Sequence, residues 1–323
     1  MKQLGKDILT AIFMGMILPG ILLNVAVLWL EREEEPQAVP QSTAPEIIPH
    51  PMLMRSPEGT LTEMDMDTYL TGVVLAEMPA SFEAEALKAQ AVAARTYTQK
   101  ASVTGGKHGD GSVCIQSSCC QAYITETDYL ARGGTQDDLE KVRSAVTETS
   151  GIVLTYEGEL IEAVYFSTSG GSTEDAAAVW GTDFPYLQSV SSPGEEGAAH
   201  YTDTVTFTPE EVAALLGAEL SGDPKTWFTI TTYTEGGGVA SMTIGGQVYK
   251  GTQLRSKLGL RSTAFSVEVS DSRITVTTRG YGHRVGMSQY GADAMAATGS
   301  TYEEILAHYY PGTVLTLVEK TTL

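Results

Sequence analysis

Residues 69–97 constrain the fold more than any other stretch, because they read as two helices separated by a proline. Asp67 is the expected N-cap of the first helix. One face of that helix repeats at i, i+3, i+4 and i+7 and consists of Leu70, Val73, Val74 and Glu77. Pro79 prevents the helix from running further, so Glu77 is expected near its C-terminal end.

Glu77 is a carboxylate at a position where the helical pattern requires an apolar residue. Apolar neighbours and the negative end of the helix dipole both disfavour the charged form, so we expect a raised pKa. A carboxyl group with a raised pKa donates a proton near neutral pH, as a general acid does. The pattern alone favours the alternative, an exposed glutamate at a frayed helix end.

The second helix is expected to begin after a Ser81 cap. A stripe of small and apolar residues lets it pack closely against another element; the stripe is Leu87, Ala91, Ala94 and Thr98. Lys88 and Arg95 share a different face, seven residues apart. These two cations either hold polar groups of a substrate or are solvated, in which case Glu85 pairs with Lys88 at i, i+3.

A family resemblance is carried by two adjacent segments, GVVLAEMP at 72–79 and FEAEALKAQAVAARTY at 82–97. Together they resemble the signature of the stage II sporulation protein D family, a group of peptidoglycan lytic transglycosylases. The resemblance implies that Glu77, the residue before Met-Pro, is the catalytic acid. It also implies that polar positions of the second helix face the cleft and bind substrate, namely Lys88, Gln90 and Arg95.

The N-terminal region contains an uncharged run at 8–30 that is long enough to span a bilayer. Lys2 and Lys6 precede it and a Glu-rich segment follows, so the N-terminus is expected in the cytoplasm. Residues 1–30 are therefore expected to be a cytoplasmic tip and a single transmembrane helix, with a cleaved signal peptide as the alternative. Residues 31–57 hold six of the 13 prolines and are expected to form an extended stalk.

Residues 58–323 are expected to form one continuous α+β domain of mixed helices and short antiparallel sheets around a catalytic cleft. The net charge of −20 argues against nucleic acid and anionic lipid as partners, but it is compatible with a sugar polymer. Expected helices are 137–149, 209–216 and one from 287; expected strands are 59–66, 151–166 with a turn at 156–159, and 274–278.

All three cysteines lie in one loop with a histidine. His108, Cys114 and Cys120 are each separated by five residues, and imidazole and thiolate are ligands that zinc prefers. From the spacing alone a disulfide is equally compatible, although three cysteines leave at least one thiol unpaired. The resemblance implies zinc with a structural role, because clostridial members of the family have a similar site. Cys119 either replaces Cys120 or supplies a fourth ligand.

Two later segments also resemble the family: YFSTSGGSTE at 165–174 and GYGHRVGMSQYG at 280–291. The resemblance implies substrate binding by four residues, namely Ser169, His283, Ser288 and Gln289. From composition alone the first segment is an ordinary turn. For His283 the alternative is a hydrogen bond that stabilises its own loop. Arg284 stands where the family usually has glycine. Trp180 is interpreted as part of a sugar-stacking or structural wall.

A further matching segment, TQLRSKLGLRSTAF at 252–265, is interpreted as scaffold. The resemblance as a whole implies a membrane-anchored enzyme with an extracytoplasmic domain, on the mother-cell side of the engulfing septal membrane. It would cleave the MurNAc–GlcNAc bond of peptidoglycan and leave 1,6-anhydro-MurNAc ends. Implied partners are glycan strands, the stage II sporulation amidase (protein P) and its membrane adaptor (protein M). Two alternatives remain: a two-carboxylate hydrolase, and a non-catalytic glycan-binding enhancer of a cell-wall amidase.

Overall fold

The computed structural model describes residues 52–270 and 273–318. The expected transmembrane helix at 8–30 and most of the expected stalk lie outside these residues. Among the helices that are described, none combines the length and the apolar character needed to cross a bilayer.

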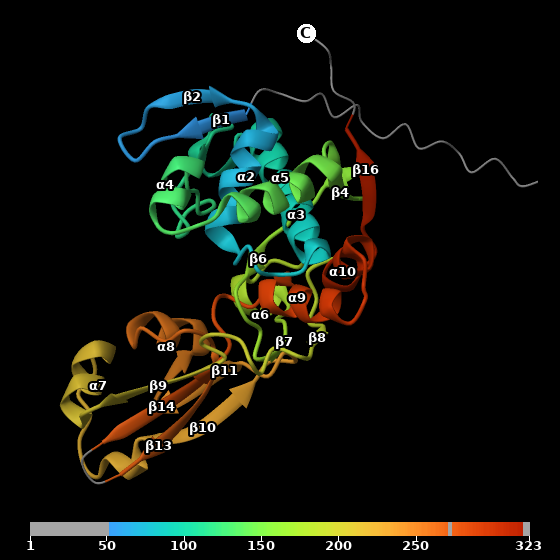
Figure 1. The fold of residues 1–323 in the computed structure, drawn as a ribbon. Coiled ribbons are helices and arrows are strands. Elements are labelled where there is room, and N and C mark those ends of the chain that lie inside the picture. Colours follow the sequence, from blue (N-terminus) through green and yellow to red (C-terminus); the bar gives the residue numbers. More distant parts are fainter. Residues whose placement is uncertain (1–51, 271–272, 319–323) are drawn as a thin grey trace, which may run out of the picture. The chain divides into compact units, whose positions relative to one another are not determined.

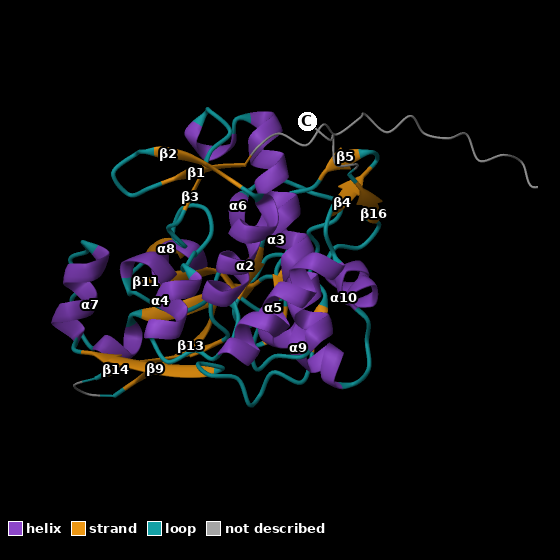
Figure 2. Ribbon diagram, turned by 45° about the horizontal axis from the view of Figure 1, so that its top comes forward, coloured by secondary structure: helices purple, strands orange, loops and turns teal. Residues whose placement is uncertain are grey.

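The described residues form a mixed α+β fold with short sheets (Figures 1 and 2). The helices are α2 (Met66–Glu77), α3 (Ala84–Thr104), α4 (Glu126–Ala131), α5 (Gln136–Glu148), α6 (Ala176–Trp180), α7 (Pro209–Leu216), α8 (Gly251–Lys257), α9 (Gln289–Ala297) and α10 (Tyr302–Tyr309). The strands are β1 (Met52–Arg55), β2 (Leu61–Met64), β3 (Val113–Cys114), β4 (Ile152–Tyr156), β5 (Glu159–Leu160), β6 (Tyr165–Phe166), β7 (Gly171–Ser172), β8 (Ser191–Ser192), β9 (Thr202–Phe207), β10 (Phe228–Tyr233), β11 (Val239–Ile244), β12 (Gln247–Lys250), β13 (Ala264–Val269), β14 (Ile274–Arg279), β15 (Met287–Ser288) and β16 (Val314–Leu317).

Helix α3 is the centre of the first hydrophobic core, where it packs against α2, α5, α9, α10 and β4 (Figure 1). Its alanines allow close approach of these neighbours because their side chains are small. Five of them are fully buried: Ala86, Ala89, Ala91, Ala93 and Ala94. The helix is therefore surrounded on most sides, and little of its surface remains to face a cleft.

A second hydrophobic core lies elsewhere in the described chain. It is formed by α7 and α8 with two antiparallel three-stranded sheets, β13-β14-β9 and β10-β11-β12 (Figure 2). The sheets were predicted to be antiparallel, but two strand pairs are parallel. Strand β1 pairs parallel with β3, and β15 pairs parallel with β6.

The start of the folded region lies earlier than residue 58. Strand β1 falls within the expected stalk, yet it pairs with β2 through Met52 and Met64 and with β3 through Met54 and Val113. Met52 is only 1% exposed and belongs to the first core. The high proline content of residues 31–57 led to the prediction of a stalk, so this short apolar strand was missed.

Both expected helix caps were wrong by a few residues. Asp65 caps α2, because its carboxylate accepts a hydrogen bond from the Thr68 N–H at 2.9 Å. Asp67 lies inside the first turn instead. Helix α3 begins after Glu83, without a side-chain cap, because the chain makes another turn at 79–82. The other expected elements are present within a few residues, except that 151–166 divides into β4, β5 and β6.

Candidate active site and metal centre

A cavity of about 870 Å³ lies beside the C-terminal end of α2. Segments far apart in the sequence meet there, including α2, the loop after β3, β6, α8 and the loop before α9. The lining combines aromatic rings with a few charged and amide groups. The lining side chains include Glu77, Lys107, Glu162, Trp180, Arg255, Tyr281, His283 and Gln289.

Glu77 is the last residue of α2 and its carboxyl group faces this cavity. Its Oε1 accepts a hydrogen bond from the Ala122 N–H at 2.7 Å, and its Oε2 accepts one from Gln289 Nε2 at 3.3 Å. Burial raises the pKa of Glu77, while these two hydrogen bonds oppose the rise. Both donors are neutral, so the burial of the carboxyl group is not compensated by a cation. The direction agrees with the sequence-based expectation.

Gln121 holds the backbone that supplies the Ala122 donor. The Gln121 side chain is buried, and its Nε2 donates to Tyr69 Oη at 3.1 Å and to Thr98 Oγ1 at 2.9 Å. Its Oε1 accepts a hydrogen bond from Tyr165 Oη at 2.8 Å. The loop next to Glu77 is thus tied to α2, α3 and β6. The sequence reasoning missed Gln121 and Ala122, since nothing local marks a backbone N–H as part of a site.

Four potential metal ligands gather at the start of the same loop: His108, Cys114, Cys119 and Cys120. Their donor atoms lie within 4.8 Å of one another, and Cys119 and Cys120 also line the cavity. The three cysteines form no disulfide. Cys119 Sγ and Cys120 Sγ lie 3.9 Å and 3.6 Å from His108 Nε2, and 3.9 Å from each other. A tetrahedral zinc ion separates its sulfur and nitrogen ligands by roughly 3.5–3.8 Å, so this donor set fits zinc.

Comparisons with known proteins identify the family. A family model described as "Stage II sporulation protein" matches residues 55–156. The stage II sporulation protein D of Bacillus subtilis is 42% identical over 263 residues, which cover 80% of this chain and 76% of the relative. This chain belongs to the stage II sporulation protein D family. The corresponding protein of Bacillus amyloliquefaciens is 41% identical over 262 residues, with the same coverage.

A third relative has a name that indicates a different role. The amidase enhancer of Bacillus subtilis is 32% identical over 300 residues, which cover 76% of this chain and 40% of that protein. Relatives of this stage II sporulation protein D family member therefore carry the names of a sporulation protein and of an amidase enhancer.

Three residues of α3 that the family resemblance assigned to substrate binding do not line the cavity. Lys88 Nζ pairs with Glu85 at 2.9 Å and with Glu148 at 2.8 Å. Gln90 is fully buried, and Arg95 is 3% exposed. Arg95 donates to the carbonyl oxygens of Thr149 and Val146 and pairs with Asp67, and it thereby joins α3 to α5 and α2. The structure does not support a role in binding substrate for these side chains, because α3 is a core helix.

Ser169 and Ser288 are also buried and do not line the cavity. Ser169 Oγ donates to Glu195 Oε2 at 2.9 Å, and Ser288 caps α9 by accepting a hydrogen bond from the Gly291 N–H. The expected roles of these two serines in substrate binding are likewise unsupported.

His283 and Gln289 do reach the cavity. The imidazole of His283 packs against Phe166 and Trp180, with ring centroids 5.6 and 5.3 Å apart. Burial lowers the pKa of His283 to about 4, so the ring is neutral at neutral pH. Its Nδ1 accepts a hydrogen bond from the Val285 N–H at 3.1 Å, which is the loop-stabilising bond of the alternative interpretation.

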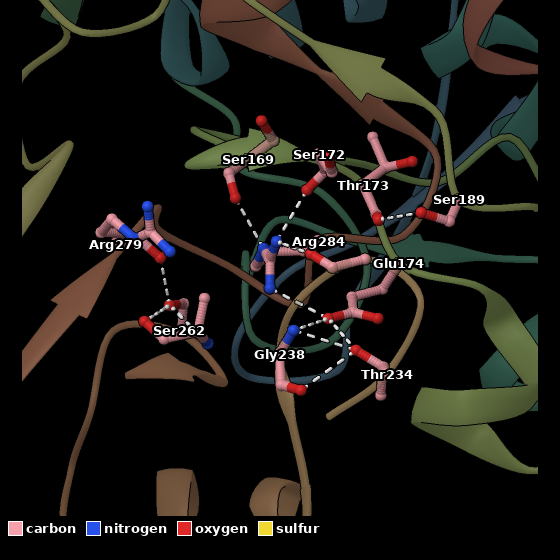
Figure 3. A network of polar contacts seen from close by, with 12 residues as sticks. Ser169, Ser172, Thr173, Glu174, Ser189, Thr234, Gly238, Ser262, Arg279 and Arg284 are labelled. Atoms are coloured by element: carbon pink, nitrogen blue, oxygen red, sulfur yellow. Dashed lines mark hydrogen bonds and ion pairs between the residues drawn. The ribbon is translucent and has the colours of Figure 1, made fainter. Parts of the chain in front are cut away.

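Arg284 occupies the left-handed backbone region, with a φ of 66°, where the family usually has glycine. Its buried guanidinium pairs with Glu174 at 2.9 Å (Figure 3). It also donates to the carbonyl oxygens of Ser169, Ser172 and Gly236. These bonds offset the cost of the backbone conformation, which therefore remains the one that glycine favours.

Arg255, on α8, is a cavity residue that the sequence reasoning missed. It belongs to the segment interpreted as scaffold, and that interpretation was incomplete. Trp180 also lines the cavity. It is 44% exposed, so its ring is accessible to a ligand. No pattern within 252–265 distinguishes Arg255 from its neighbours Arg261 and Lys257, so only the packing of α8 reveals its position.

Proposed function

We propose that the protein is a peptidoglycan lytic transglycosylase in which Glu77 is the acid. The observation that supports this most is a single carboxyl group with a raised pKa that faces a large cavity and lies between two neutral donors. Membership in the stage II sporulation protein D family supports a role in cell-wall remodelling during sporulation. The exposed face of Trp180 supports a sugar as ligand.

The proposed reaction needs one acid that later acts as a base. Glu77 gives its proton to the glycosidic oxygen between MurNAc and GlcNAc, and the bond from that oxygen to C1 breaks as oxocarbenium character develops. The C6 hydroxyl oxygen of the same MurNAc then bonds to C1, and its proton passes to the Glu77 carboxylate. A 1,6-anhydro ring forms, the acid is restored, and no water is consumed.

The cavity residues have different roles in this reaction. Gln289 Nε2 and the Ala122 N–H stabilise the carboxylate that exists between the two proton transfers. The neutral His283 and Trp180 offer ring surfaces for a sugar and exclude water. Exclusion of water favours attack by the internal hydroxyl over hydrolysis.

A hydrolase remains the second enzymatic candidate, because Glu162 lines the same cavity. Glu162 Oε1 pairs with Lys100 Nζ at 3.0 Å, however, so this carboxylate is already held by a cation of its own chain. Similarity to the amidase enhancer favours a third candidate, a glycan-binding protein without cleavage. The raised pKa of Glu77 has no role in simple binding.

Product analysis separates the three candidates. Peptide-free glycan strands are incubated with the purified full chain, and the products are analysed by mass spectrometry in isotopically labelled water. A transglycosylase releases 1,6-anhydro products that are lighter by one water and carry no label. Labelled reducing ends would instead identify a hydrolase, and strands that stay intact while bound would support the enhancer.

A metal ion is part of the proposed function. We propose that His108, Cys114, Cys119 and Cys120 hold one structural zinc ion, which would cross-link the loop that carries Ala122.

We also propose that residues 8–30 anchor the protein in the cell membrane with its domain outside the cytoplasm. Glycan strands, the sporulation amidase protein P and the adaptor protein M are its proposed partners. Protease accessibility in intact protoplasts and co-purification test these assignments.

A further inference from the structure

Arg255 differs from the other arginines that the structure buries partly or fully. Each of those pairs with a carboxylate: Arg55 with Asp110, Arg95 with Asp67, Arg261 with Asp203, and Arg284 with Glu174. Within residues 52–270 and 273–318, Arg255 has no ion pair. Its one hydrogen bond runs from Nε to the carbonyl oxygen of Arg261 at 3.2 Å, which leaves both terminal nitrogens available.

A guanidinium that is partly removed from water without a counter-ion is unfavourable for the fold. The effect is visible in the pKa of Arg255, which burial lowers from its usual value, although the group remains charged. Because the Nε bond holds the side chain in one orientation, the free edge of the guanidinium is preorganised. Such an edge matches a carboxylate, which accepts two parallel hydrogen bonds from it.

The surrounding charges favour an anion at this position. The charged or titratable side chains of the cavity wall include Glu77, Lys107, Glu162 and Arg255. Glu162 is neutralised by Lys100, and Glu77 must be protonated to act as an acid. Lys107 Nζ lies 6.0 Å from the centroid of the Tyr97 ring and adds positive charge. The working cavity therefore carries net positive charge inside a protein whose overall charge is −20.

We propose that Arg255 binds a carboxylate carried by the glycan and so selects an acidic sugar polymer over a neutral one. This inference rests on the proposed function. In peptidoglycan the carboxylate is either the lactyl group of MurNAc, when the stem peptide is absent, or a terminal carboxylate of the peptide. Trp180 and Tyr281 line the same cavity and are 44% and 39% exposed, so part of each ring is available to the sugars that carry the acid.

The position of Arg255 gives the second core a part in recognition. Arg255 lies on α8, whose Leu254 is fully buried in the second core, whereas Glu77 lies on α2 of the first core. A glycan whose acid binds Arg255 while its glycosidic oxygen reaches Glu77 contacts both cores at once. Affinity for the acidic group thus helps to align the bond that breaks.

The test compares ligands as well as variants. Binding of peptide-free glycan strands to the full chain carrying Glu77→Gln is measured by calorimetry, before and after the lactyl carboxylates are converted to methyl amides. Peptide-bearing strands form a third ligand. We expect amidation to weaken binding at least tenfold, and Arg255→Gln to weaken binding of the unmodified strands equally. Arg255→Gln should not weaken binding of the amidated strands further.

Two controls keep the interpretation specific. Arg255→Lys retains the charge but loses the paired hydrogen bonds, so its affinity should fall between those of arginine and glutamine. Arg132→Gln, at an exposed arginine outside the cavity, should bind all ligands as the parent does. Because amidation needs no change in the protein, the prediction is testable even if an Arg255 variant folds poorly.

The outcomes separate recognition from catalysis. Equal affinity for unmodified, amidated and peptide-bearing strands would overturn the carboxylate proposal, even if the wild-type chain cleaves them. Arg255-dependent binding without cleavage by the wild-type chain would support recognition and overturn the transglycosylase. Dependence on Arg255 seen only with peptide-bearing strands would assign the carboxylate to the peptide, and dependence seen with peptide-free strands would assign it to the lactyl group.

Discussion

Two glutamates in different regions, the half-buried Glu77 and the fully buried Glu174, differ in what compensates their charge. Glu174 Oε1 accepts hydrogen bonds from Arg284 Nη1 at 2.9 Å, Thr234 Oγ1 at 2.9 Å and the Gly238 N–H at 3.0 Å (Figure 3). Glu77 has the Ala122 N–H, Gln289 Nε2 and an adjoining cavity, but no cation.

The difference shows that burial alone does not make a carboxyl group chemically useful. A buried ion pair commits the carboxylate to holding three chain segments together. A carboxyl group with neutral donors is easier to protonate and remains accessible to a ligand, at some cost to stability. We therefore expect a change of Glu77 to lower activity more than stability. Loss of the cation that pairs with Glu174 should lower stability more than activity.

The largest effect is expected for Glu77→Gln. The amide keeps the shape and accepts the Ala122 hydrogen bond, but it cannot donate a proton to a leaving oxygen, so cleavage should fall by about 10²–10⁴-fold. Initial rates on glycan strands measure the loss. If Glu77→Gln kept activity within about tenfold, Glu77 would not be the acid.

The same substitution has a pH signature with a definite sign. The pKa of Glu77 is raised in the folded state, so its contribution to stability is present below the unfolded pKa and is lost as the pH rises through the folded pKa. Above that pH, Glu77→Gln should melt at a higher temperature than the wild type, and the two should converge in acid. The rate of cleavage by the wild type should fall over the same rise in pH, because the acid loses its proton.

The second largest effect is expected for Arg284→Met, which leaves Glu174 buried without its cation. Folding should weaken by about 3–5 kcal/mol in urea unfolding, because the unpaired charge stays in the interior. Activity per folded molecule should change little in comparison. A loss below about 1 kcal/mol would mean that the ion pair does not hold this region together.

A third prediction concerns the loop beside Glu77. Elemental analysis of protein purified without added metal should find about one zinc per chain, and chelation should lower stability first and activity as a consequence. Since Cys119 belongs to the same cluster as Cys120, Cys119→Ser and Cys120→Ser should lose metal to a similar extent. Less than about one zinc per ten chains, together with a mass showing two thiols oxidised to a disulfide, would refute a zinc site.

The smallest effect is expected for Lys88→Met. Lys88 forms its ion pairs with Glu85 and Glu148 away from the cavity, and such partly exposed pairs contribute about 0–1 kcal/mol to stability. Cleavage rates should remain within about twofold of the wild type. A large loss of kcat/KM with unchanged stability would restore the role in substrate binding that the motif implied.

Local spacing in the sequence determined which residues lie together on one element. The i, i+3, i+4, i+7 repeat and Pro79 placed Glu77 at the end of α2, where the structure has it. The concentration of cysteines in one loop with a histidine indicated a group of potential metal ligands, and these side chains do gather, with Cys119 as a fourth donor. These features depend on neighbours in the chain, so a sequence pattern suffices to predict them.

Only the tertiary structure decided which neighbour covers each face. Lys88 and Arg95 share a face of α3, but α5 covers it and binds both residues, whereas Arg255 reaches the cavity from a segment interpreted as scaffold. The Ala122 N–H beside Glu77 has no signature in the sequence. Contacts between segments far apart in the chain depend on how whole elements pack, and spacing within one element carries no information about its packing partners.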